Sequence, residues 1–404
     1  RRVLALPGAG SIQRGEALGL LGLVCVNHGG DTREGLEHLG RAQQLAKATG
    51  DRLALANACM LAGNARLGLG QLDPARDDFS RYALLCQELG LPDEALCASL
   101  NLAQVAYEQG RFVESWQRAR AGAQAAREMG NKIYEAFGLA YVTLAGCQLG
   151  YLTEAEDAGR AAQAVADELG LEAVLLQVGA ARLEAAVFLG RLGGAEEQAV
   201  ALRKRAVDQD GAIALSLGVV YALSGETAAA IEQLRLARIA AERSGNQVAQ
   251  ARVALGFGQV ALASGQIAVA HARAQDALAL AQAAGAQVAL LRAHLLVAQT
   301  AWQLGRPEAT EASLAAAQAI AAALPSPHWQ AIAWMAQSRF CPDGTTLRLR
   351  AATHIQFYLQ QLPPRARQEF LNWPERRDAL SGRGTGALEL RVPAAPMPFR
   401  ETVS

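Results

Sequence analysis

Glycines recur along this chain with a period of 40 residues, and this period constrains the fold more than any other feature of the sequence. A second series of turn residues lies twenty positions later, so each unit contains two turns. About 18 residues rich in Ala, Leu, Gln, Glu and Arg separate the turns, which predicts a helix of roughly 27 Å between each two. The first series is Gly30, Gly70, Gly110, Gly150, Gly190, Gly225, Gly265 and Gly305, and the second is Gly50, Gly90, Gly130, Gly170, Asp210, Gly245, Gly285 and Pro325. Glycine suits these positions because a helix often ends with a residue at positive φ.

Small residues fill two further columns of the repeat. Five positions after the first-series glycines stand Gly35, Ala75, Ser115, Ala155, Ala195, Ala230, Ala270 and Thr310; seven positions before them stand Gly63, Ala103, Thr143, Gly218, Gly258 and Ala298, with Leu23 and Leu183 as exceptions. Small side chains on both helices let two backbones approach closely. One helix pair cannot bury both of its faces, so the pairs are expected to stack.

One unit is shorter than the others. The step from Gly190 to Gly225 is 35 residues, and the helix over residues 212–224 is about one turn shorter than its counterparts. We therefore expect the curvature of the stack to change locally between residues 190 and 245.

Residues 211–244 resemble a tetratricopeptide motif, because Leu217, Gly218, Tyr221, Ala230 and Ala237 occupy its small and aromatic positions. The 40-residue units resemble the longer variant in the carboxy-terminal arrays of bacterial maltose-activator-like ATPase regulators and of signalling kinases or cyclases. This resemblance implies an all-α fold, a right-handed α-solenoid of about eight tetratricopeptide-like helix pairs over residues 12–340, with a C-terminal helical cap.

The two ends depart from the repeat. Residues 1–11 are interpreted as the end of a linker, and residues 381–404, rich in Gly and Pro, as a disordered tail. Residues 341–380 are predicted to form capping helices. Their apolar residues would cover the exposed face of the last repeat: Phe357, Leu359, Leu362, Phe370, Leu371 and Trp373.

Composition disfavours several classes of function. Lys plus Arg equals Asp plus Glu at 38 each, which gives no overall field to attract nucleic acid or a membrane surface. The six cysteines include no CxxC pair and the six histidines no HxxxH pair, so we expect no metal, no cofactor and a reducing cytoplasm. The letters around Gly256 and Gly258 match a dinucleotide fingerprint, but they lie inside a predicted helix. No catalytic constellation is found, and we expect a protein that is not an enzyme.

A candidate binding surface follows the concave face of the predicted superhelix. Amides recur six residues before the first-series glycines, and an amide can both donate to and accept from a peptide backbone. Arg252 and Arg292 lie seven residues before two of these amides, on the same helix face. The candidate site residues are Asn57, Asn64, Asn101, Gln104, Tyr107, Glu184, Arg252, Gln259, Arg292, Gln299 and Trp302. Five of them, from Arg252 to Trp302, are expected to form one patch.

Two hypotheses for function remain open. The first is a non-catalytic scaffold that binds a protein or extended peptide in its groove, as the interaction module of a larger bacterial signalling or transcription-regulating protein; self-association is a further option. The second is a small-molecule effector sensor coupled to an amino-terminal ATPase, kinase or cyclase domain. Asn64 and Asn101 also resemble the asparagines of carboxylate-clamp tetratricopeptide domains, but Met60 stands where those domains have a lysine. A closed pocket would favour the sensor, and an open polar groove the scaffold.

Overall fold

Every regular element in the part of the chain that the structure describes is a helix. The computed structural model describes residues 11–27, 32–205, 211–340 and 344–380. Its helices are α1 (Ser11–Asn27), α2 (Thr32–Thr49), α3 (Arg52–Gly68), α4 (Leu72–Leu89), α5 (Pro92–Glu108), α6 (Phe112–Glu128), α7 (Lys132–Leu149), α8 (Leu152–Leu169), α9 (Glu172–Phe188) and α10 (Leu192–Arg205). They continue with α11 (Gly211–Leu223), α12 (Thr227–Ser244), α13 (Gln247–Ala263), α14 (Ile267–Ala284), α15 (Gln287–Gln303), α16 (Pro307–Ala323), α17 (Pro327–Ser338), α18 (Gly344–Gln361), α19 (Pro364–Phe370) and α20 (Pro374–Leu380).

The predicted turns coincide with the helix ends. Among the described residues, every glycine of the two series has a positive φ, from +62° at Gly170 to +82° at Gly150. No residue other than glycine has a positive φ in these segments. Gly30 and Asp210 lie outside the described residues. The 40-residue period therefore sets the length of the helices, because each glycine ends one helix and starts the turn to the next.

The two columns of small residues face each other inside each helix pair. The Ser115 hydroxyl donates to the Ala103 carbonyl at 2.8 Å, and Thr310 donates to the carbonyl of Ala298 at 3.4 Å. Both hydroxyls come from one column and both carbonyls from the other. Ala230 is fully buried in the same position. The prediction of close backbone approach at one level of the helix pair is confirmed for these two pairs.

Helix α11 is the short helix expected from the 35-residue unit. It has 13 residues, whereas the neighbouring first helices of a pair, α9 and α13, have 17 each. The missing residues amount to about one helical turn. A local change of curvature at this unit stays a prediction.

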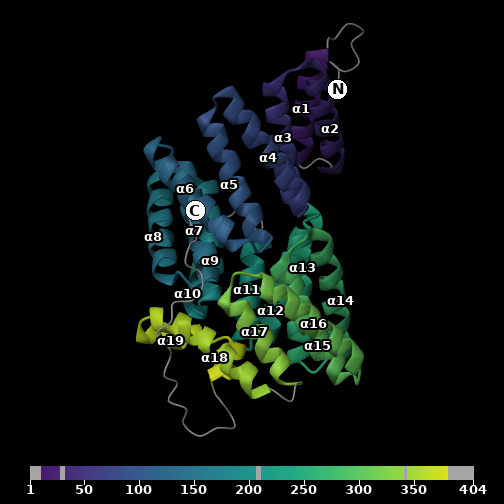
Figure 1. Ribbon diagram of the computed structural model, residues 1–404, viewed down its shortest axis with the longest axis vertical. Helices are drawn as coiled ribbons and strands as arrows, with labels where there is room; N and C mark the ends of the chain where they lie inside the picture. Colours follow the sequence, from purple (N-terminus) through teal and green to yellow (C-terminus); the bar gives the residue numbers. More distant parts are fainter. Residues whose placement is uncertain (1–10, 28–31, 206–210, 341–343, 381–404) are drawn as a thin grey trace.

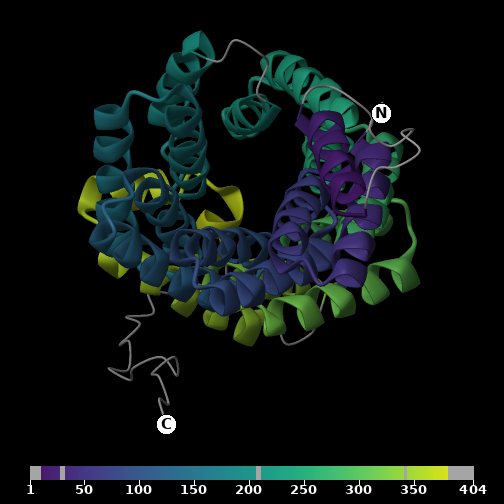
Figure 2. The same cartoon turned by 90° about the horizontal axis from the view of Figure 1, so that it is seen from above.

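The stack of pairs coils so tightly that its second turn lies directly on its first. We call α1–α10 the first turn and α11–α20 the second turn. Seen from above, the helices run round a central opening (Figure 2). The amide of Gln247 donates to the carbonyl of Leu69 at 3.0 Å, and Arg252 pairs with Glu108 across 144 positions of sequence. Contacts of this range lie outside the nearest-neighbour scheme of an extended solenoid.

The helix-end glycines of the first turn sit against the second turn. A Cβ atom at Gly70, Gly110, Gly150 or Gly190 would overlap Val248, Leu324, Phe357 or Glu369, respectively. The corresponding glycines of the second turn, Gly225, Gly265 and Gly305, have open space at that position. The first-turn glycines therefore serve a helix end and a close contact at once.

The carboxy-terminal helices pack on the last repeat and on the first turn. α17 and α18 pack together as a ninth helix pair, and α18, α19 and α20 continue over the end of the stack (Figure 1). Of the six residues expected to cap the last repeat, all but Trp373 join one apolar cluster with Ala331 and Met335 of α17 and with Cys147 and Phe188 of the first turn. The expected linker end, except for Ser11, and the expected tail lie outside the described residues.

Hydrogen bonds fix this segment to the end of α9. Asn372 donates to the carbonyl of Gly190 at 2.7 Å, and the Trp373 indole donates to that of Val187 at 2.9 Å. The guanidinium of Arg376, fully buried, donates to Phe188 at 2.6 Å and to Phe370 at 3.1 Å. These carbonyls lie at the ends of α9 and α19, where fewer backbone donors are available than inside a helix. These bonds thus join the second turn to the first at the end of α9.

Candidate functional site

A cavity of about 660 Å³ lies inside the coil, between the two turns. Its wall combines α5, α7 and α9 of the first turn with α11, α13, α15 and α17 of the second, and Trp373 closes one side. These are the first helices of successive pairs, which face the axis of the superhelix (Figure 2). The volume falls in the range of about 300–1,000 Å³ typical of small-ligand sites.

One wall of the cavity carries two carboxylates and one guanidinium. The Tyr107 hydroxyl donates to Glu184 at 2.8 Å, and Arg252 donates to Glu108 at 2.7 Å. Burial raises the pKa of Tyr107, and the Glu184 carboxylate raises it further, so the phenol keeps its proton.

The ion pair between Arg252 and Glu108 acts mainly on the charge of the Arg252 guanidinium. The Glu108 carboxylate raises the pKa of Arg252 above its usual value, so the guanidinium is always charged. Burial raises the pKa of Glu108, Arg252 opposes this rise, and the nearby Glu184 adds to it. Two carboxylates thus share one cation in this part of the cavity.

The neighbouring part of the wall is aromatic and built around His328, whose ring contacts Phe188 one helical turn after Glu184. The Trp329 indole donates to the Gln148 side-chain oxygen at 2.9 Å, which joins α17 to α7. His328 lies edge-on to Phe188 with ring centroids 5.1 Å apart, and its Nδ1 accepts from Arg376 at 3.3 Å. Burial lowers the pKa of His328 well below its usual value, and the charges of Arg376 and Arg292 lower it further. The ring is therefore neutral, with its proton on Nε2.

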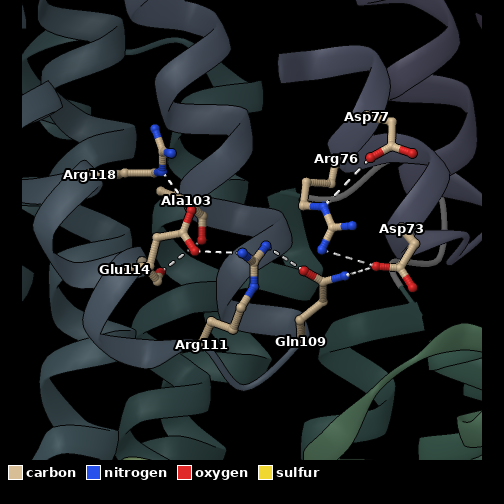
Figure 3. Close-up of polar contacts among 9 residues, drawn as sticks. Asp73, Arg76, Asp77, Ala103, Gln109, Arg111, Glu114 and Arg118 are labelled. Atoms are coloured by element: carbon tan, nitrogen blue, oxygen red, sulfur yellow. Dashed lines mark hydrogen bonds and ion pairs between the residues drawn. The ribbon is translucent and has the colours of Figure 1, made fainter. Parts of the chain in front are cut away.

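A polar network on the outside holds the neighbouring turns of the second and third pairs together (Figure 3). Gln109 donates to Asp73 at 2.9 Å and accepts from Arg111 at 2.5 Å. Arg111 also pairs with Glu114 at 2.6 Å, which in turn accepts from Arg118 at 2.8 Å. These side chains border the place where Gly110 meets the second turn. Surface ion pairs are individually weak, so we assign the network to positioning of the turns.

The structure brings five of the eleven predicted site residues into the cavity wall: Gln104, Tyr107, Glu184, Arg252 and Arg292. Asn64 lines a second hollow of about 670 Å³, which shares Gln104, Glu108 and Arg252 with the first. Gln259 lies beside the cavity and accepts from Arg292 at 3.2 Å.

Besides Gln259, four predicted residues lie outside the lining of both hollows. Asn57 is exposed, Asn101 donates to the Cys97 sulfur at 3.8 Å, and Gln299 is half-buried. Trp302 is 55% exposed near the carboxyl end of α15, with its ring 5.0 Å from that of Phe340. The expected patch from Arg252 to Trp302 is therefore divided: Arg292 contacts Gln259, and Trp302 is not part of the cavity.

The cavity also contains residues that the sequence did not single out. Glu108 and Gln148 lie two positions before a first-series glycine, one helical turn beyond the amide column, so extending that column would have found them. His328, Trp329 and Trp373 follow the last regular repeat. No repeat position marks them, because they reach the cavity only through the stacking of the second turn on the first.

No group of three or more His, Cys, Asp or Glu side chains among the described residues is arranged to hold a metal ion. None of the described helices is both long and apolar enough to span a membrane.

Comparison with known proteins gives distant structural likenesses only. No family model matches the sequence, and no curated protein is significantly similar to it. A Rap protein complexed with competence and sporulation factor is 13% identical over 78% of this chain and 77% of its own, with a TM-score of 0.43. The APC/C hetero-tetramer Cut9–Hcn1 is 11% identical over 92% and 89%, with a TM-score of 0.41. The TPR domain of P58(IPK) is 12% identical over 93% and 100%, with a TM-score of 0.24.

The class of protein follows from the helices themselves. The described chain is an all-α helical-repeat protein, as predicted, with its pairs coiled round an internal cavity.

Proposed function

We propose that this chain is a non-catalytic, tetratricopeptide-like binding module of a larger bacterial signalling or transcription-regulating protein of the cytoplasm, and that its effector occupies the central cavity. The observation that carries the proposal is that both turns of the coil contribute residues to the cavity wall. An effector in this cavity touches both turns at once. Its binding energy therefore favours the closed packing of the two turns, which is how a ligand can shift the shape of an array.

Filling the cavity tests this proposal. Ala180 lies on α9 in the cavity wall, and Ala180→Trp places an indole in the space that an effector would occupy. Ala272→Trp on the exposed face of α14 is the matched control. Native mass spectrometry and thermal shift with a metabolite and peptide library should detect ligands of the wild type and of Ala272→Trp, with at least tenfold weaker binding to Ala180→Trp. Ligands that bind all three proteins alike would contradict the proposal.

A second candidate function is capture of an extended protein segment, with neither nucleic acid nor a membrane surface as partner. The second hollow, which continues from the cavity towards Asn64, supports it because a longer ligand could follow both. Arg292 and Trp302 separate the two functions. A segment that follows the whole concave face would lose affinity with either Arg292→Ala or Trp302→Ala, and more than tenfold, or about 1.4 kcal/mol, with both. A ligand confined to the cavity would respond to Arg292→Ala alone, in a titration that measures Kd.

A further inference from the structure

Two buried side chains of the cavity wall each have a donor group with no acceptor among the described residues. Gln148 is only 6% exposed, and its side-chain oxygen is engaged by Trp329, which leaves the amide NH₂ group. His328 is 1% exposed, and its Nδ1 accepts from Arg376, which leaves the Nε2 hydrogen. Polar groups of buried side chains are usually hydrogen-bonded in folded proteins. Both residues line the cavity, so a ligand there is the natural acceptor.

These donors lie on one side of the cavity and favour an anionic group. The rings of His328 and Trp329 are 4.6 Å apart, so the indole that binds Gln148 also contacts His328. The charge of Arg292, on the same cavity wall as His328, adds a positive potential, as its effect on the pKa of that imidazole indicates. Two neutral donors beside a guanidinium match the two oxygens of a carboxylate.

The part of the cavity wall that contains Glu184 favours a cation. Glu184 accepts from Tyr107, and it forms no ion pair with a described residue. Arg252 is bonded to Glu108, so the guanidinium in this part of the wall is already paired with another carboxylate. Glu184 is half-buried, and a carboxylate with a single hydrogen bond has capacity for more donors, of which an ammonium group supplies three.

We infer that the ligand of the cavity is a zwitterion of the amino-acid type, with its ammonium group on Glu184 and its carboxylate on Gln148 and His328. The inference rests on the proposed function and adds the chemical class of the effector. Aromatic and aliphatic side chains, among them Phe188 and Trp373, fill the wall around these polar groups and would accept an apolar side chain. A free amino acid and a short peptide with free ends share this chemistry.

Calorimetric titration with defined probes tests the inference. The probes are L-phenylalanine and the peptides Ala-Phe and Ala-Ala-Phe, each also in an N-acetylated and a C-amidated form. Zwitterionic probes should bind the wild type, and blocking either end should weaken binding at least tenfold. Tightest binding of L-phenylalanine would identify a free amino acid as the ligand, and tightest binding of Ala-Phe or Ala-Ala-Phe would identify a short peptide.

Two isosteric variants connect each end to its residue. With Glu184→Gln, N-acetylation should no longer cost affinity, whereas Glu232→Gln on the exposed face of α12 should behave as wild type. Gln148→Glu keeps the oxygen that accepts from Trp329 but replaces the free donor with a charge, so it should abolish the preference for a free carboxylate. Circular dichroism and melting temperatures establish that each variant is folded.

The outcomes separate failure of the zwitterion inference from failure of the cavity as the binding site. Equal binding of blocked and free probes, or no binding of any zwitterionic probe, overturns the inference. A library ligand that carries neither charge, and that Ala180→Trp excludes, would overturn the inference and leave the cavity as the binding site. Zwitterions that bind Ala180→Trp as well as wild type would remove both proposals.

Discussion

Substitution of Gly190 measures how strongly the second turn is held on the first. Gly190 has φ +74°, and a Cβ atom there would overlap the Glu369 carbonyl and crowd Phe370. Gly265 is the matched position two repeats later, with φ +72° and open space around its Cβ position. Alanine at either site adopts a left-handed conformation, at a cost of about 1–2 kcal/mol. The difference between the two variants isolates the contact between turns.

The size of this difference follows from the bonds that Gly190→Ala displaces. Asn372, Trp373 and Arg376 each donate to a carbonyl at the end of α9, at 2.7, 2.9 and 2.6 Å. A net contribution of about 0.5–1.5 kcal/mol for each of the three bonds gives roughly 1.5–4.5 kcal/mol in total. Opening of the carboxy-terminal segment should therefore be about ten- to a thousand-fold more frequent in Gly190→Ala than in Gly265→Ala.

Hydrogen exchange followed by mass spectrometry is the suitable assay, because a helical array opens region by region. Gly190→Ala should increase exchange in residues 364–380 and at the end of α9, with little change in α1–α4. Gly265→Ala should leave residues 364–380 as in the wild type. Equal protection of this segment in the two variants would refute the stacking of turns as an energetic contact.

Three further predictions concern stability. In urea unfolding, Ala230→Leu should destabilise the protein by about 1–3 kcal/mol and Ala228→Leu by much less, because Ala230 is buried in the small column whereas Ala228 is exposed. Equal midpoints of the two variants would contradict this. Because the pKa of His328 is lowered in the folded protein, a decrease in pH protonates this imidazole in the unfolded chain before it does so in the folded one. The free energy of unfolding should therefore fall below about pH 6.5, by at most about 1.4 kcal/mol per pH unit from this group. His328→Gln should reduce that slope in melting curves at pH 7 and 5, and an unchanged slope would count against it. Removal of residues 345–380 should expose the apolar cluster of the cap and cause self-association in light scattering; a monomer of unchanged stability would exclude this.

The helices were predictable because their signals are local. A glycine at positive φ is required wherever a helix ends in this way, so the turns at Gly70 and Gly225 could be predicted from spacing alone. The same holds for Ala230, whose burial follows from its position in the repeat. The coiling of the stack was not predictable in this way. It depends on small rotations between pairs, and no single residue encodes them.

The candidate site was predictable only where the repeat continues. Tyr107, Glu184 and Arg252 lie on the inner helix face, and the period identifies that face. The position of Trp302 shows the limit of this reasoning, because residues on one face of a helix can still lie at opposite ends of it. His328 and Trp373 belong to the closing segment, and their role depends on a contact with residues about 180 positions earlier in the sequence.

The bond between Trp373 and the Val187 carbonyl also bears on how the protein folds as it is synthesised. Most helical arrays can fold from one end, since each repeat needs only its neighbour. Here the carbonyls at the end of α9, near residue 190, receive their last hydrogen-bond donors only when the ribosome has synthesised Asn372 and Trp373. At typical synthesis rates of about 5–20 residues per second, the first turn waits roughly 10–40 s with the apolar edge around Phe188 uncovered. During this interval the half-made chain is open to premature contact with other chains, and a chaperone that covers the edge of α7–α9 would protect it.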